Sequence, residues 1–288
     1  MNFVPWNTLY EDTLKWERQL PEFDAICGVP RSGLIPASIL ALRRNVRMVA
    51  MSDLLSASDL STVISSAPIR ATNPIVRYAK PYSNRLLIVD DSSSNTSSTL
   101  NAIRSQLNGR DGLQISYAAV YRAPQSNVDY FFREVRMPRM FGWNWFRHWD
   151  LQFAISDIDG VLCEDWLYRT EMSVDPEYVK FIETVKPLYL PAMPVRRLVT
   201  GRLERYREKT KKWLASHGVR YSELIMHPAD TPESRRKRGD TWKIKANVYA
   251  ADLEAKLFIE SSRKQAEKIF EATGRPVLCI DTQEMFSG

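Results

Sequence analysis

The segment LLIVDDSSSNTSSTL, residues 86–100, combines an apolar half with a polar half. The apolar half ends in two aspartates and predicts a buried strand, whereas the polar half consists of Ser, Thr and Asn and has the composition of a flexible linker. Strand patterns lie on both sides of the segment, so no domain boundary falls near it. We therefore interpret the polar half as a loop at the carboxyl end of a strand, where open α/β sheets bind ligands.

Strand patterns alternate with helical patterns along the chain, which is typical of parallel α/β sheets. A segment rich in Trp and Phe, residues 136–150, separates two blocks of such patterns. Because aromatic side chains bury apolar area, we interpret it as a packed connector and not as a disordered linker. The sequence thus predicts an α/β protein with two Rossmann-like domains, each with a mainly parallel sheet flanked by helices: residues 1–135, the connector 136–150, and residues 151–288. The predicted strands are residues 23–29, 47–51, 85–90, 114–122, 151–157, 196–200, 223–227, 255–260 and 276–280.

The composition, with 44% apolar and 26% charged residues, is that of a soluble globular protein. No apolar run approaches the ~20 residues that span a bilayer, and the first residues lack the apolar core of a signal peptide. The three cysteines share no metal or redox spacing, which predicts a cytoplasmic protein. The three histidines are scattered and argue against a His-based metal site. A net charge of +6 fits phosphorylated substrates and an ordinary solvated surface equally well.

A second loop lies in ICGVPRSGL, residues 26–34, between a strand pattern and a helical pattern. It contains Pro30, Arg31, Ser32 and Gly33. Backbone N–H groups, a hydroxyl and a guanidinium at the start of a helix are suited to binding an anion. Taken alone, the segment is equally an ordinary strand–turn–helix connection with an exposed arginine.

Together the two loops resemble those of the type I phosphoribosyltransferases. The resemblance implies that residues 28–34 are the pyrophosphate loop, with Pro30, Arg31, Ser32 and Gly33 at the leaving pyrophosphate. It places Asp90 and Asp91 at the ribose hydroxyls of 5-phosphoribosyl pyrophosphate (PRPP) as catalytic residues, with Mg²⁺ bridging ribose and pyrophosphate. Residues 60–84 would hold a loop that closes over the site. The PRPP-binding loop that follows the aspartates would contain Asn95, Thr96, Ser97, Ser98 and Thr99.

Ser97 and Ser98 stand where this family usually has one or two glycines, which let the backbone approach the phosphate. A domain that binds PRPP but transfers it weakly is therefore an alternative to an active transferase.

In the second block, Asp157 and Asp159 stand two residues apart after an apolar strand pattern, so both side chains project from one face. A structural Asp-x-Asp-Gly turn is the alternative for this piece alone. A nucleophilic carboxylate, a second acid, a hydroxyl, a lysine and a metal-binding acid together meet the needs of phosphoryl transfer. The further pieces are LVTGR at 198–202, a helical stretch opened by Lys245, and LFIESS at 257–262.

In this order, the motifs of residues 151–288 resemble the haloacid dehalogenase (HAD) superfamily of phosphatases. Residues 199–228 are similar to the phosphatase domain of polynucleotide kinase-phosphatases. The resemblance implies that Asp157 attacks phosphorus to give an aspartyl-phosphate. Asp159 would protonate the leaving oxygen and later activate water, which needs a carboxyl pKa tuned toward neutrality. Thr200, Gly201, Arg202 and Lys245 would bind the phosphoryl group, with Lys243 as the alternative lysine, and Mg²⁺ would be held by Asp157, the Asp159 backbone carbonyl and Glu260.

The two halves predict a bifunctional enzyme that transfers 5-phosphoribosyl from PRPP to an unidentified acceptor and then removes the 5-phosphate, giving a riboside. One alternative is a phosphatase on a nucleotide or sugar phosphate whose first domain senses PRPP or a nucleotide. Another is a nucleic-acid-binding protein that trims terminal phosphates, which is not favoured because basic and aromatic residues do not interleave. The predicted partners are small molecules, with no membrane, and a homo-oligomer stays open. We interpret the basic run 235–238 as a solvent loop, with substrate contact as the alternative.

Overall fold

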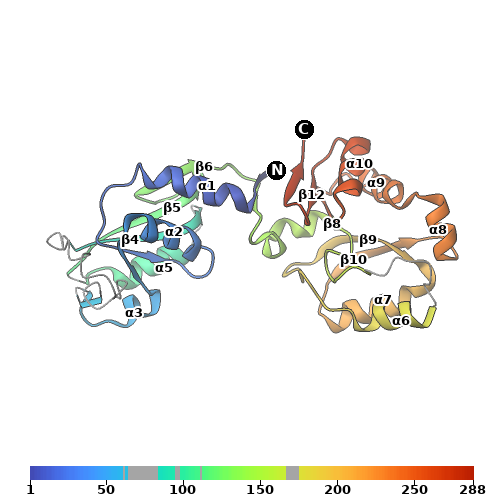
Figure 1. The fold of residues 1–288 in the computed structure, drawn as a ribbon, viewed down its shortest axis with the longest axis horizontal. Helices are drawn as coiled ribbons and strands as arrows, with labels where there is room; N and C mark the ends of the chain where they lie inside the picture. Colours follow the sequence, from blue (N-terminus) through green and yellow to red (C-terminus); the bar gives the residue numbers. More distant parts are fainter. Residues whose placement is uncertain (61, 64–83, 95–97, 111, 167–174) are drawn as a thin grey trace. The chain divides into compact units, whose positions relative to one another are not determined.

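The structure is a computed structural model that describes residues 1–60, 62–63, 84–94, 98–110, 112–166 and 175–288. The chain forms two compact units, residues 2–139 and residues 140–288 with Met1 (Figure 1). The division falls inside the segment predicted as a connector, and residues 140–150 belong to the second unit. The apolar side chains buried in this part of the chain are Met140, Phe141, Trp143 and Trp145.

The first unit is built on a five-stranded sheet in the order β3-β2-β4-β5-β6, in which all neighbouring strands are parallel. Its strands are β2 (Ala25–Gly28), β3 (Arg47–Val49), β4 (Arg85–Ser93), β5 (Gln114–Arg122) and β6 (Tyr130–Glu134), and the short β1 (Asn2–Val4) precedes them. Its helices are α1 (Trp6–Glu17), α2 (Leu34–Arg44), α3 (Met51–Ser56) and α5 (Ser98–Leu107).

Helices cover both faces of this sheet. Alternate residues of a strand point to opposite faces, so neighbouring residues of one strand contact different helices. Ala25 and Cys27 of β2 belong to a buried apolar cluster with residues of α3 and α5. Gly28 points to the other face, where a Cβ atom would lie 2.9 Å from the Cβ of Ala37 in α2. The sheet is therefore buried on both sides, as its nearly continuous apolar strands predict.

The second unit contains a six-stranded sheet in the order β10-β9-β8-β11-β12-β13. Neighbouring strands are parallel except at the last pair, β12 and β13. Its strands are β8 (Ala154–Ser156), β9 (Val195–Leu203), β10 (Tyr221–His227), β11 (Leu257–Glu260), β12 (Val277–Cys279) and β13 (Glu284–Phe286), and β7 (Arg139–Phe141) lies at its start. Its helices are α6 (Asp175–Thr184), α7 (Arg207–Ser216), α8 (Pro232–Arg238), α9 (Thr241–Ala251) and α10 (Arg263–Thr273), with 3₁₀ turns η2 (Trp145–Arg147), η3 (Trp149–Phe153) and η4 (Glu204–Tyr206).

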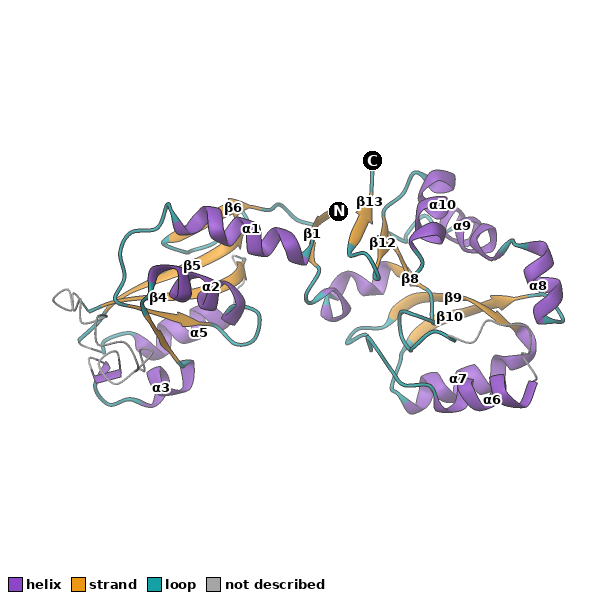
Figure 2. Ribbon diagram, viewed as in Figure 1, coloured by secondary structure: helices purple, strands orange, loops and turns teal. Residues whose placement is uncertain are grey.

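In this unit α9 and α10 lie on one face of the sheet and α6 and α7 on the other (Figure 2). Residues of α9 and α10 share a buried cluster with Ile155 of β8, Val199 of β9 and Phe258 of β11. The predicted α/β class, with mainly parallel sheets flanked by helices, is confirmed by both units.

Each sheet has a point at which the strand order reverses. From β2 the chain adds β3 on one side and then places β4 on the other, and from β8 it adds β9 and β10 on one side and then places β11 on the other. Loops that leave the carboxyl ends of parallel strands diverge at such a point and open a crevice there. The loops after β2 and β4, and those after β8 and β11, are the ones that carry the predicted site residues.

Several predicted boundaries are wrong. Strand β4 continues past residue 90 to Ser93 because β5 keeps pairing with it, and Ser92 lies opposite Tyr121. Residues 151–153 form the end of a 3₁₀ turn, and Met51 begins a helix. Helix α9 begins at Thr241, so Lys245 lies in its second turn and does not open it. The basic run 235–238 is helical, as part of α8, and not a loop. Four short strands, β1, β6, β7 and β13, were not predicted.

Within the described part of the chain, no helix combines the length and the hydrophobicity needed to cross a membrane.

Candidate active site

The buried core of the second unit's site is an ammonium group between two carboxylates. Nζ of Lys245 lies 2.6 Å from Oδ2 of Asp157 and 2.6 Å from Oε2 of Glu260. Asp157 follows β8 directly, Glu260 is the last residue of β11, and Lys245 reaches them from α9. The Lys245 and Glu260 side chains are 1% and 0% exposed. Lys243, the alternative lysine, is exposed and lies near the ring of Trp242.

Further hydrogen bonds fix both carboxylates. Oδ1 of Asp157 accepts the backbone N–H of Ile158 at 2.7 Å, and Oε1 of Glu260 accepts the backbone N–H groups of Ser261 and Ser262. Burial raises the pKa of Asp157 to about 8, although the nearby ammonium of Lys245 acts in the opposite direction. Burial opposes the charge of Lys245, but the two carboxylates outweigh it and raise the pKa of that ammonium.

Asp159 is held in a separate ion pair with Arg202. Nη2 of Arg202 lies 2.6 Å from Oδ1 of Asp159, and Nε lies 3.0 Å from Oδ2, so the pair is bidentate. Burial raises the pKa of Asp159, but the guanidinium outweighs it and holds this pKa below its usual range. The prediction that the pKa of Asp159 is tuned toward neutrality is therefore wrong for this arrangement. The sequence did not reveal that Arg202 forms an ion pair with Asp159.

Arg202 and Thr200 do not line the cavity that Asp157 and Asp159 line. The Arg202 side chain is fully buried, and its Nη1 donates to Oγ1 of Thr210 in α7 at 3.4 Å. Oγ1 of Thr200 accepts the backbone N–H of Arg202 at 3.1 Å. Gly201, between them, does line the cavity, because alternate residues of β9 face opposite sides. Of the four predicted phosphate-binding residues, Gly201 and Lys245 thus meet at the cavity.

Gly160 is required by the turn that presents the two aspartates. Its φ is +78°, and a Cβ atom there would lie 2.4 Å from Oγ of Ser261. That hydroxyl donates to the backbone carbonyl of Asp159 at 3.2 Å. Ser261 therefore ties the loop after β8 to the loop after β11.

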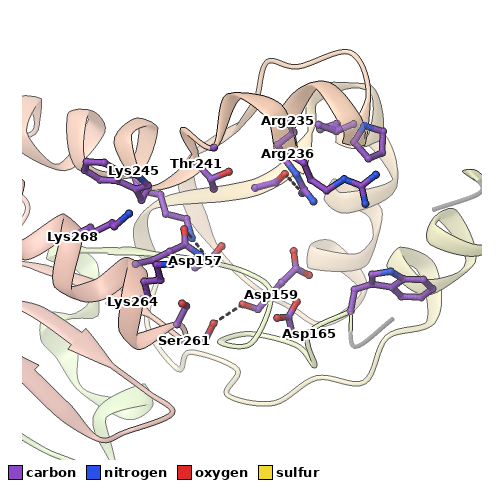
Figure 3. Close-up of a pocket in the computed structure, with 18 of the residues that line it drawn as sticks. Asp157, Asp159, Asp165, Arg235, Arg236, Thr241, Lys245, Ser261, Lys264 and Lys268 are labelled. Atoms are coloured by element: carbon purple, nitrogen blue, oxygen red, sulfur yellow. Dashed lines mark hydrogen bonds and ion pairs between the residues drawn. The ribbon is translucent and has the colours of Figure 1, made fainter. Parts of the chain in front are cut away.

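The cavity has a volume of about 540 Å³ and opens around Asp157 and Asp159 (Figure 3). Basic side chains from two helices surround it: Arg235 and Arg236 of α8 and Lys264 and Lys268 of α10. For Arg235 and Arg236, substrate contact was only the alternative to the prediction of a solvent loop. Sequence analysis missed other lining residues, among them Asp165, Tyr178, Thr241, Trp242, Lys264, Gln265 and Lys268.

Asp157, Glu260 and the Asp159 carbonyl offer hard oxygen atoms, the type that Mg²⁺ prefers, and Mg²⁺ commonly takes one or two carboxylates and completes its shell with water. Both carboxylates contact Nζ of Lys245, each with one oxygen atom at 2.6 Å, so the two carboxylates are close together. The described residues contain no group of three or more His, Cys, Asp or Glu side chains that could hold a metal ion. The donor types suit Mg²⁺, but one oxygen of each carboxylate contacts Nζ of Lys245 and the other accepts a backbone N–H group, so the Mg²⁺ site stays a prediction.

In the first unit, the loop after β2 meets the loop-side end of β4. Oγ of Ser32 donates to Oδ1 of Asp91 at 2.7 Å, and Oδ1 of Asp90 accepts the backbone N–H of Asp91 at 2.8 Å. Both aspartates are buried, and burial, followed by the charge of Asp91, raises the pKa of Asp90. Arg31 and Pro30 are exposed at the mouth of this loop.

Gly33 is required by the close approach of the loop after β2 to β4. A Cβ atom there would lie 2.7 Å from the carbonyl oxygens of Val29 and Val89. Arg139, which sequence analysis missed, is buried behind the aspartates, where Nη2 donates to the carbonyl of Ser93 at 2.8 Å. Burial lowers the pKa of this guanidinium, while the charge of Asp91 acts in the opposite direction.

The predicted PRPP-binding loop is described only in part. Asn95, Thr96 and Ser97 lie outside the described residues, as does most of the segment 60–84. Ser98 begins α5, and Thr99 is exposed in its first turn.

No family model matches this chain. Among solved structures it is similar to a purine phosphoribosyltransferase from Pyrococcus horikoshii, at 20% sequence identity and a TM-score of 0.34, over 49% of this chain and 92% of that one. It is similar to a xanthine-guanine-hypoxanthine phosphoribosyltransferase from Helicobacter pylori, at 17% identity and a TM-score of 0.34, over 49% and 92%. An orotate phosphoribosyltransferase from Aeropyrum pernix matches at 18% identity and a TM-score of 0.27, over 45% and 71%. Because these identities and scores are low, the proposal below rests on the side chains themselves.

Proposed function

We propose that the second unit hydrolyses phosphate monoesters through an aspartyl-phosphate formed on Asp157. The observation that carries the proposal is the buried trio of Asp157, Lys245 and Glu260, of which Asp157 and Lys245 line a cavity with basic walls. Its position at the reversal point of a parallel sheet is where such folds bind ligands.

In the first step, a carboxylate oxygen of Asp157 forms a bond to phosphorus while the bond to the ester oxygen breaks. Lys245 offsets the charge on the phosphoryl oxygens, and the leaving oxygen takes a proton from solvent water. Arg202 holds the pKa of Asp159 below its usual range, which makes this carboxyl a poor donor of that proton. The ionised carboxylate suits the second step, in which it accepts a proton from the water that attacks the aspartyl-phosphate. When bound at Asp157, Glu260 and the Asp159 carbonyl, Mg²⁺ would supply further positive charge for the phosphoryl oxygens.

We propose that the first unit binds PRPP and transfers its phosphoribosyl group to an acceptor. The proposal is supported by the loop of residues 30–33, which meets Asp91 through Ser32, and by the resemblance of both loops to type I phosphoribosyltransferases. The phosphatase site would then remove the 5-phosphate of the product. The combined reaction releases pyrophosphate and then phosphate, and leaves a riboside.

A second candidate, favoured by one observation, is a first unit that binds PRPP without transferring it. Ser97 and Ser98 stand where type I phosphoribosyltransferases usually have one or two glycines, which let the backbone approach the phosphate. In that case the first unit senses PRPP and the second alone performs chemistry.

The test uses full-length protein with Mg²⁺, PRPP and a panel of bases and sugars, and follows phosphate release and product mass. Asp157→Asn protein should stop at the phosphoribosyl compound, which mass spectrometry would identify. Asp230→Asn, at an exposed acid outside the cavity, should behave as the wild type. Phosphate release that never depends on an acceptor, with no riboside formed, would exclude the coupled reaction. Phosphate release that survives in Asp157→Asn would exclude the proposed nucleophile.

A further inference from the structure

The cavity of the second unit has more positive charge than its catalytic core uses. Five cationic side chains line it: Arg235, Arg236, Lys245, Lys264 and Lys268. Two carboxylates already hold Lys245, and Arg236 pairs with Glu233 at 3.2 Å. Among the described residues, Lys264 and Lys268 make no ion pair, and Nη1 of Arg235 donates only to the carbonyl of Gly201, at 2.6 Å. Three cations are thus available to a bound anion.

Lys264 and Lys268 form a pair on one face of α10. They are four residues apart, so their side chains lie one helical turn apart on the same side of the helix. Nζ of Lys268 also lies 5.2 Å from the centre of the Trp242 ring, which lines the cavity as well. This contact holds the ammonium at the cavity wall without neutralising its charge.

The unpaired cations lie on two sides of the nucleophile. Lys264 and Lys268 lie on one side of Asp157, and Arg235 lies on the other (Figure 3). A single phosphoryl group placed for attack by Asp157 meets Lys245 and has no need of cations on both sides. A molecule with two anionic groups would engage both, because charge-assisted hydrogen bonds to phosphate are among the stronger polar contacts.

We propose that the substrate of this site is a phosphate monoester that carries a second phosphate, bound by Lys264 and Lys268. This inference rests on the proposed function of Asp157 and adds the class of substrate: a bisphosphorylated small molecule. In the coupled reaction, the acceptor must then itself carry a phosphate, since transfer from PRPP adds only the 5-phosphate. The second phosphate does not react. It orients the first phosphate over Asp157.

The test is a binding comparison that does not need turnover. Fructose 1,6-bisphosphate and fructose 6-phosphate are titrated calorimetrically into full-length Asp157→Asn protein with Mg²⁺ present. We expect the bisphosphate to bind on the order of tenfold more tightly. The advantage should disappear when Lys264→Gln and Lys268→Gln are added together.

Arg263→Gln is the matched control, because Arg263 is on the same helix but pairs with Glu284 at 2.9 Å and does not line the cavity. It should keep the full advantage. Equal binding of the two probes, or an advantage that survives in the double lysine variant, would overturn the inference. The second result would place the bisphosphate elsewhere on the chain. Hydrolysis of p-nitrophenyl phosphate by wild-type protein tests the phosphatase itself, so failure of the proposed function is seen separately.

Discussion

Replacing Lys245 with methionine tests the central electrostatic feature of the second unit. The substitution keeps most of the side-chain volume and removes the ammonium that lies 2.6 Å from both Asp157 and Glu260. The two carboxylates, 8% and 0% exposed, then face each other without a counter-charge. Removing one partner of a buried ion pair typically costs about 3–5 kcal/mol. For a unit of about 150 residues, this corresponds to a fall in Tm of roughly 6–20 °C.

The loss should depend on pH with a definite sign. Without the ammonium, the folded-state pKa of Asp157 rises further above its unfolded value. A group with a raised folded pKa contributes stability at low pH and loses it as pH rises through the folded pKa. The difference in free energy of unfolding between wild type and variant should therefore be small near pH 4 and largest near pH 8.

Urea unfolding followed by tryptophan fluorescence suits this measurement, because six of the eight tryptophans lie in residues 140–288. A chelator removes metal, which would otherwise add its own pH dependence. Lys243→Met, on the same helix but at an exposed side chain, should change stability by no more than about 0.5 kcal/mol. A loss below about 1 kcal/mol at pH 8, or an equal loss at pH 4 and pH 8, would refute the reasoning.

Three further predictions concern single side chains. In metal-free buffer, Asp157→Asn should gain stability relative to wild type as pH rises from 4 to 8. The wild-type carboxyl has a folded pKa of about 8, so its contribution to the free energy of unfolding falls over that range, whereas an amide does not titrate. A difference in the free energy of urea unfolding that stays constant with pH would contradict this. Arg202→Gln should cost about 1–3 kcal/mol at pH 7, less than Lys245→Met, since Asp159 is 18% exposed and water can reach it. NMR titration should also show a higher pKa for Asp159 in that variant, and an unchanged pKa would count against the ion pair. Gly33→Ala should destabilise the first unit by about 1–3 kcal/mol, since its Cβ would meet two carbonyl oxygens at 2.7 Å; an unchanged urea midpoint would show that the loop can shift freely.

Sequence patterns predicted the strand ends at which the site residues gather. Asp157 and Glu260 were identified because apolar runs end at them, and the parallel arrangement of such strands brings their carboxyl ends to one edge. The choice of Lys245 over Lys243 rested on a weak local signal. Helical geometry could have supported it only if the first residue of α9 had been known, and the pattern placed that residue four positions too late.

The error at Arg202 has a different cause. The motif Thr-Gly-Arg suggested a phosphate-binding guanidinium, but β9 continues to Leu203, so alternation turns Thr200 and Arg202 to the face opposite Gly201. An end of the strand at residue 200 would have left the arginine in a loop, free to reach the cavity. The difference of three residues is set by pairing with β10, where Leu203 lies opposite His227.

By itself the sequence determined the α/β class and the two blocks of strands and helices, because these depend on local apolar periodicity and on nearby turn residues. The tertiary structure alone decided that β11 lies beside β8, and thus that Glu260 and Asp157 share one ammonium. It also decided that α8 and α10 bring Arg235, Lys264 and Lys268 to the same cavity. Strand order and the rotation of a helix about its axis follow from the packing of segments distant in sequence, and no local pattern encodes them.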